Sequence, residues 1–68
     1  MSRLHTLTIY AVQLTRGAHT YRVHWTDETR KEARRQLGRW ASDPDMNFNW
    51  YDAAVLSQEM RKVDPENY

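Results

Sequence analysis

The 68-residue sequence has no cysteine, only two glycines and two prolines, and no long apolar segment. Without cysteine the chain forms no disulfide and offers no thiolate for zinc, for an iron–sulfur cluster or for nucleophilic catalysis. Its apolar runs are only a few residues long, whereas a helix needs about 20 apolar residues to cross a bilayer. The first residues also lack the apolar stretch that is typical of a secretory signal. We therefore expect a cytoplasmic protein that makes no contact with a membrane.

Catalytic and metal-binding motifs are missing as well. The sequence contains no glycine-rich phosphate loop, no serine nucleophile elbow and no HExxH pair. His5, His19 and His24 do not have the spacing that places two metal ligands side by side on a helix. Asp43 and Asp45 flank a proline, which indicates a turn and not a paired general acid and base. We predict no catalytic residue, no metal site, no cofactor and no small-molecule substrate, and hence a protein that is not an enzyme.

The residues that are present suffice for one small core. Hydrophobic residues make up 40% of the chain, including three Trp, four Tyr and one Phe. This length allows a single domain over residues 1–68. A domain of about 60 residues buries only about 60% of the surface that its unfolded chain exposes. Such a domain is marginally stable unless a cross-link or a partner supports it.

Two β-strands are predicted over residues 4–15 and 20–26. In the second strand apolar and polar residues alternate with the period of two that a half-buried strand shows. Gly17 suits the first central position of a two-residue type II′ turn, which needs a positive φ, and a four-residue loop over 16–19 gives the same register. This register places Leu14 opposite Tyr21, Val12 opposite Val23 and Tyr10 opposite Trp25. All six apolar side chains then lie on one face, so turn and pattern predict the same hairpin.

A first helix is predicted over residues 28–42. Thr29 and Glu32 match a capping box, and Thr26 followed by two acids is an equally good N-cap. The helix has to end before Pro44, because proline disfavours helical geometry in the residue that precedes it. Gly38 inside this helix costs up to about 1 kcal/mol relative to alanine. We therefore expect a neighbour to pack closely against Gly38.

A second helix is predicted over residues 50–63, with Asn49 as its N-cap and Asp52 at the third position. Residues 64–68 are expected to form a frayed tail. One apolar face is predicted on each helix. These faces comprise Ala33, Leu37, Trp40 and Ala41 on the first helix, and Trp50, Ala53, Leu56, Met60 and Val63 on the second, with Phe48 also in the core.

The expected fold is α+β: an N-terminal β-hairpin followed by two helices (ββαα), with the helical hairpin packed on one face of the sheet. A two-stranded sheet is marginal by itself, even with helices on one face. Leu7 and Ile9 extend the apolar positions of the first strand beyond the length that the second strand covers. We therefore expect the sheet to be extended by dimerisation, with Leu7 and Ile9 as the residues of self-association.

Charge divides unevenly along the chain. Residues 1–42 contain eight Lys or Arg and three Asp or Glu, whereas residues 43–68 contain two and six. The candidate face for an anionic partner consists of Arg30, Lys31, Arg34, Arg35 and Arg39 on the first helix, with Arg22 on the open face of the sheet. Two interpretations follow. The basic face contacts an anionic partner, or the acidic half of the chain neutralises it.

We predict a small non-enzymatic protein–protein interaction module that self-associates, as a dimer, or binds another protein. Trp and Tyr together with Arg are the residues that interface hot spots use, and residues 47–52 are rich in aromatics. The alternative is a nucleic-acid-binding accessory protein that contacts phosphates through the basic face of the first helix. The net charge of +1 and the isoelectric point of about 8.2 are low for a dedicated nucleic-acid-binding domain.

Overall fold

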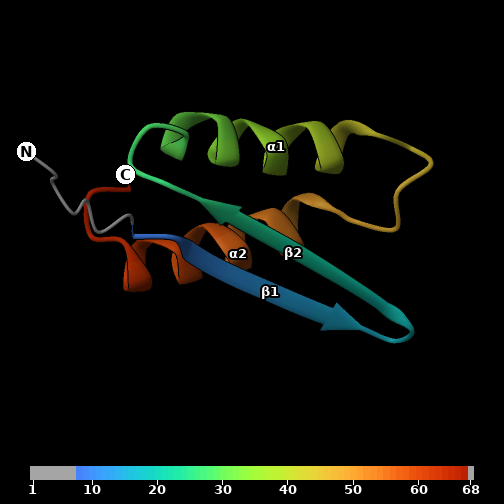
Figure 1. Ribbon diagram of the computed structural model, residues 1–68. Helices are drawn as coiled ribbons and strands as arrows, with labels where there is room; N and C mark the ends of the chain where they lie inside the picture. The colour runs from blue at the N-terminus through green and yellow to red at the C-terminus, as the bar shows by residue number, and fades with distance from the viewer. Residues whose placement is uncertain (1–7, 68) are drawn as a thin grey trace, which may run out of the picture.

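The chain forms a β-hairpin followed by two helices, as Figure 1 shows. The computed structural model describes residues 8–67. Strand β1 spans Tyr10–Arg16, β2 spans His19–Trp25, helix α1 spans Arg30–Ser42 and α2 spans Trp50–Val63. The predicted ββαα arrangement is confirmed. β1 begins later than the strand predicted over 4–15, and residues 4–7 of that prediction lie outside the described residues.

The hairpin has the register that its turn and its apolar residues predict. Leu14 pairs with Tyr21, Val12 with Val23 and Tyr10 with Trp25. Gly17 has a φ of +60°, and it is the only residue with a positive φ in the described part of the chain. One positive φ at the first central position is typical of a type II′ turn, whereas type I′ needs two. The turn therefore sets the pairing register that brings the apolar residues of both strands to the same face of the sheet.

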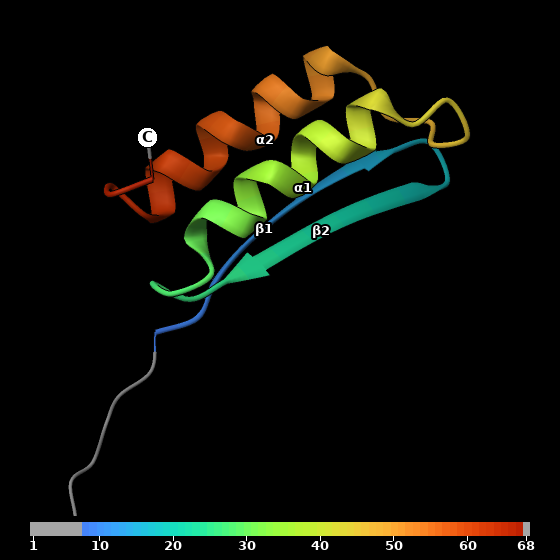
Figure 2. The same cartoon turned by 90° about the horizontal axis from the view of Figure 1, so that it is seen from above.

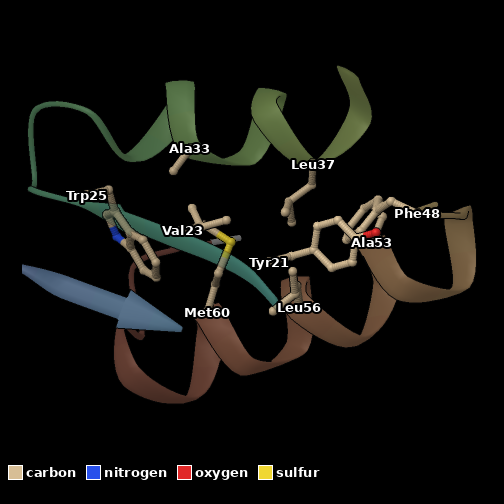
Figure 3. Packing of buried hydrophobic residues seen from close by; sticks show 9 residues of the cluster. All are labelled: Tyr21, Val23, Trp25, Ala33, Leu37, Phe48, Ala53, Leu56 and Met60. Carbon is tan, nitrogen blue, oxygen red and sulfur yellow. The ribbon is translucent and has the colours of Figure 1, made fainter. Parts of the chain in front are cut away.

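The two helices lie side by side over one face of the sheet, as the view from above in Figure 2 shows. α2 packs against β1, and α1 packs against both β2 and α2. Nine buried side chains form the core between the layers (Figure 3). Trp25 is the largest of them and is only 2% exposed. The opposite face of the sheet carries exposed side chains: Ala11, Gln13, Thr15, Thr20, Arg22 and His24.

The two helices begin differently. α2 has the predicted capping box, in which the Asp52 amide donates to Asn49 Oδ1 at 2.9 Å and the Asn49 amide donates to Asp52 Oδ2 at 3.1 Å. The box predicted for Thr29 and Glu32 is wrong. Thr29 precedes α1, but its hydroxyl caps no helical amide and instead accepts from the Thr26 amide at 2.8 Å. Because the chain turns over residues 26–29, α1 begins at Arg30, two residues after the predicted boundary.

The segment after α2 is docked against the domain, in contrast to the frayed tail that the sequence predicts. Asp64 and Asn67 are each 1% exposed. The Asn67 amide donates to the Asp64 carbonyl at 2.9 Å, which closes a turn. This turn places the Asp64 carboxylate beneath Trp25 and Arg30, whose donors it accepts. Hydrogen bonds to the buried Asp64 carboxylate tie this segment to β2 and α1.

Candidate interaction surfaces

Strand β1 is an outer strand of a two-stranded sheet, and within residues 8–67 no further strand pairs with its outer backbone edge. In a hairpin closed by a two-residue turn, the pair that flanks the turn exchanges backbone hydrogen bonds, and the pairs then alternate. Arg16 and His19 flank the turn. We therefore infer that Ala11, Gln13 and Thr15 direct their N–H and C=O groups away from β2. These outward groups are named the β1 edge.

The β1 edge has few of the features that protect natural edge strands, which carry charges, proline or bulges. The seven residues of strand β1 include no proline and pair with β2 in regular register. Its only charged residue, Arg16, stands at the turn and forms an ion pair with Asp52 of α2. Ile9 directly precedes β1 and is 63% exposed. Leu7, the other residue predicted for self-association, lies outside the described residues.

The open face of the sheet is polar, and some of its side chains hydrogen-bond to one another. Arg22 donates from Nε and Nη2 to Gln13 Oε1, at 3.2 and 3.0 Å. Thr15 and Thr20 share a hydrogen bond of 3.3 Å between their hydroxyls. Arg22, predicted to face an anionic partner, is thus exposed but engaged by a neutral amide. His24 lies on the same exposed face.

Arg30 is the one residue of the predicted basic face that the acidic half of the chain neutralises within the described residues. Its Nε donates to Asp64 Oδ2 at 2.7 Å and its Nη2 to Asp64 Oδ1 at 3.1 Å. Nη2 also reaches Asp27 Oδ1 at 2.7 Å. The side chain of Arg30 is only 16% exposed and that of Asp64 only 1%. Arg30 is therefore a structural residue and is not free to meet a partner.

The pKa values around this ion pair are shifted by the same contacts. Hydrogen bonds from Arg30 and then from the Trp25 indole hold the pKa of Asp64 below its ordinary value, against the opposing effect of burial. The hydrogen bond to Asp64 is also the main reason that the pKa of Arg30 is raised. The pKa of Tyr10 is raised, first by desolvation and then by the negative charge of Asp27. Asp64 is thus a charged carboxylate that links β2 and α1 to the end of α2.

The other basic residues of α1 differ in their partners. Arg35 and Arg39 both contact Glu32, at 3.4 and 3.2 Å, and all three side chains are more than half exposed. For Lys31 and Arg34 the described residues provide no carboxylate within 4.0 Å. The Nε of Arg34 is buried and has no hydrogen-bond partner there either. Lys31 and Arg34 therefore have no ion pair within the described residues, although both line a hollow of about 470 Å³ together with Asp27, Glu28 and Glu66.

A groove of about 310 Å³ runs between α1 and α2 and is named the helix groove. Its lining includes the buried residues Leu37 and Ala53, and Gly38 beside them. Trp50 forms one wall, and a Cβ built on Gly38 would lie 3.9 Å from Cη2 of Trp50. The close packing expected at Gly38 is therefore not found, because even an added Cβ would meet Trp50 only at ordinary van der Waals distance. Arg34 also lines this groove.

Two residues predicted for the apolar face of the second helix are exposed instead. Trp50 is 63% exposed, and Val63 is 46% exposed. Each residue of a helix turns by about 100°, so Trp50 lies about 120° around α2 from the fully buried Leu56. Val63 is the last residue of α2, and Asp64 beyond it turns inward. Phe48, just before α2, is buried in the core as predicted.

The described residues contain no group of three His, Cys, Asp or Glu side chains that could hold a metal ion. His19 and His24 are both exposed, and His5 lies outside the described part of the chain. Between residues 8 and 67, no helix is both long and apolar enough to cross a membrane. No protein-family model, no curated protein and no solved structure matches this chain.

Sequence reasoning missed Asp64, because an aspartate before a proline at the end of a helix indicates a stop signal and nothing more. One weak signal was available. A buried tryptophan needs an acceptor for its indole N–H, and Trp25 was placed in the core from the pattern alone. Nothing in the sequence distinguishes Asp64 from the other acids of residues 43–68 as that acceptor. The pairing depends on how α2 lies across the sheet.

Proposed function

We propose that this protein is a small, non-enzymatic protein–protein interaction module that self-associates through the β1 edge. The observation that carries the proposal is a seven-residue outer strand without proline or bulge, preceded by the exposed Ile9. An unprotected strand of this kind pairs readily with another strand. Self-association would also relieve the marginal stability of a two-stranded sheet.

A two-fold symmetric dimer fits the residues of β1. An antiparallel ladder centred on Gln13 places Gln13 opposite its copy and Ala11 opposite Thr15 of the second chain. Between Tyr10 and Thr15 the strand carries no charge, so this pairing opposes no like charges. The product is a four-stranded sheet with all four helices on one face. The outer strands of that sheet would be the two β2 strands, whose Arg22 charge disfavours further growth.

Sedimentation equilibrium over a concentration series tests the proposal. The chain should move from an 8.2 kDa species towards twice that mass as its concentration rises. A single 8.2 kDa species at about 1 mM, where an association of only about −4 kcal/mol would appear, contradicts it. Replacing Ile9 by glutamate should weaken the association. An unchanged dimer in Ile9→Glu would show that Ile9 is not part of the interface.

A matched pair of proline variants locates the edge. Gln13→Pro removes an outward amide from β1, and Arg22→Pro removes an outward amide from the residue opposite it on β2. Both substitutions abolish the same bonds between the Arg22 and Gln13 side chains, so their costs to the hairpin are similar. Only Gln13→Pro should abolish the dimer. Equal loss in both variants, each shown to be folded by circular dichroism, contradicts pairing through β1.

Nucleic-acid binding through the basic face of α1 remains the second candidate. Lys31 and Arg34 support it, since neither has a carboxylate within 4.0 Å among the described residues. Arg30, Arg35 and Arg39 support it less, because each contacts an acid of its own chain. Retardation of random duplex and single-stranded DNA at low and moderate salt tests it, because phosphate contacts weaken steeply with salt.

The cytoplasmic location expected from the sequence stays a prediction.

A further inference from the structure

The helix groove and a neighbouring basic hollow meet at Arg34. Lys31, Arg34 and Arg35 line a hollow of about 270 Å³, and Arg34 also lines the groove that contains Trp50. No carboxylate lines either hollow in the described part of the chain, whereas a third hollow, which Lys31 and Arg34 also line, includes Asp27, Glu28 and Glu66. One continuous surface thus has an apolar part beside Trp50 and a cationic part at Lys31, Arg34 and Arg35.

The apolar part of this surface is suited to a side chain from another molecule. Gly38, Ala53 and Ala54 are small, so they allow close approach to the space between the helices. Trp50 is 63% exposed beside this space although it is one of the largest apolar side chains in the chain. Aromatic side chains that stand beside a pocket are typical anchors of protein interfaces. The volume of about 310 Å³ is at the small end of ligand pockets, which favours one anchoring side chain over a larger ligand.

The cationic part calls for an anion with a defined position. The Nε of Arg34 is buried and out of reach of a ligand, so an anion would meet the terminal nitrogens of the guanidinium, which have no partner among the described residues either. A planar guanidinium favours carboxylate or phosphate oxygens as acceptors. Lys31, one turn earlier on α1, adds a second charge on the same side.

We propose that the helix groove binds an acidic peptide segment with one apolar anchor residue. The anchor packs against Trp50 over Gly38, and carboxylates that follow it along the peptide meet Arg34 and Lys31. This inference rests on the proposed function as an interaction module and uses a surface other than the β1 edge. A peptide is favoured over a nucleic acid because the part of the surface beside Trp50 is apolar, whereas nucleic acids need an extended track of cations.

Nuclear magnetic resonance of the ¹⁵N-labelled full chain tests the proposal. The probe is the blocked peptide Ac-Ser-Gly-Leu-Glu-Glu-Glu-NH2, which has one leucine as the anchor and glutamates after it. Saturable shifts are expected at the Trp50 indole N–H and at the Gly38 amide. The chain supplies its own controls, since the indole of the buried Trp25 and the amide of Gly17 in the hairpin turn should not move. Affinity should fall as salt is added, because part of the attraction is between charges.

Two matched pairs of variants separate the apolar and cationic parts. Trp50→Ala should weaken peptide binding about tenfold or more, as loss of an interface anchor does. Tyr51→Ala removes a neighbouring aromatic that is 74% exposed but does not line the groove, and it should leave affinity unchanged. Arg34→Gln should weaken binding and reduce its dependence on salt. Arg22→Gln, on the open face of the sheet, should do neither.

Several outcomes would overturn the proposal. These are no shift at millimolar peptide, equal binding of the same peptide with lysine in place of glutamate, or equal loss in Trp50→Ala and Tyr51→Ala. Tighter binding of random duplex DNA at the same resonances would assign the surface to nucleic acid instead. Sedimentation of the same sample without peptide keeps the two proposals distinct. A dimer that binds no peptide refutes this inference alone, and a monomer that binds the peptide refutes only self-association.

Discussion

Replacing Asp64 by asparagine should destabilise the fold more than any other isosteric change of an acid in this chain. The Asp64 carboxylate accepts from Trp25 Nε1 at 2.7 Å and from Arg30 Nε and Nη2 at 2.7 and 3.1 Å. Asparagine keeps the shape, but it loses the charge and offers an amide where an acceptor is needed. Breaking a buried ion pair by removing one partner costs about 3–5 kcal/mol. Arg30 keeps Asp27, so the lower end, about 3 kcal/mol, is expected.

That loss is a large share of the stability of a small domain. At about 0.05–0.15 kcal/mol per residue, a chain of 68 residues has a free energy of unfolding of roughly 3–10 kcal/mol. Each kcal/mol shifts Tm by about 4–8 °C in a domain of this size. Thermal melts followed by far-ultraviolet circular dichroism should therefore place Asp64→Asn on the order of 10–20 °C below the wild type.

The control for this prediction is an exposed ion pair. Glu59 contacts Lys62 at 3.0 Å, and the side chain of Lys62 is 70% exposed. Exposed pairs contribute about 0.2–1 kcal/mol, so Glu59→Gln should shift Tm by a few degrees at most. If Asp64→Asn melts no lower than Glu59→Gln, the buried network contributes little and the reasoning is wrong.

The same network predicts a dependence on pH. The pKa of Asp64 is lowered in the folded state. Its contribution is therefore complete above the unfolded pKa, near about 4, and is lost as pH falls through the folded pKa. The gap in unfolding free energy between wild type and Asp64→Asn should be constant near neutral pH and shrink in acid. A gap that stays the same down to strongly acidic pH would contradict a charged Asp64.

Three further substitutions test local structure by urea denaturation. Gly38→Ala should stabilise α1 by about 0.5–1 kcal/mol, because its Cβ would meet Trp50 only at 3.9 Å, and destabilisation would mean that the helices pack more tightly than described. Gly17→Ala should cost about 1–2 kcal/mol, since a φ of +60° is unfavourable for alanine, and no loss would contradict the type II′ turn. Asn49→Ala should cost about 1–2 kcal/mol, because it removes the Oδ1 that accepts from the Asp52 amide at the start of α2, and a neutral result would contradict the capping box.

The sequence predicts those parts of the fold that depend on neighbours along the chain. Gly17 and the alternation in β2 determine the hairpin register, and both are local patterns. Asn49 and Asp52 form their capping box because all of its atoms lie within one turn of helix. Thr29 fails as a cap because Thr26, three residues earlier, competes for its hydroxyl. The sequence offers both Thr26 and Thr29 as N-caps, and the local pattern does not show which of them begins the helix.

The parts that the sequence could not predict depend on how the layers meet. The exposure of Trp50 follows from the angle at which α2 meets the core, with Phe48 buried in its place. The loss of Arg30 from the basic face follows from the position of Asp64, 34 residues later. Both determine the candidate site. The first creates the apolar wall of the helix groove. The second leaves Lys31 and Arg34 as the cations of the predicted basic face on α1 that have no carboxylate within 4.0 Å among the described residues.

Amide hydrogen exchange measured at several protein concentrations tests self-association through β1 most directly. The outward amides of Ala11, Gln13 and Thr15 should exchange more slowly as concentration rises, because the second copy hydrogen-bonds them. The outward amides of Thr20, Arg22 and His24 on β2 should exchange at rates that do not depend on concentration. Exchange at the three β1 amides that is equally fast at every concentration, or slowing at the β2 amides instead, would contradict pairing through β1.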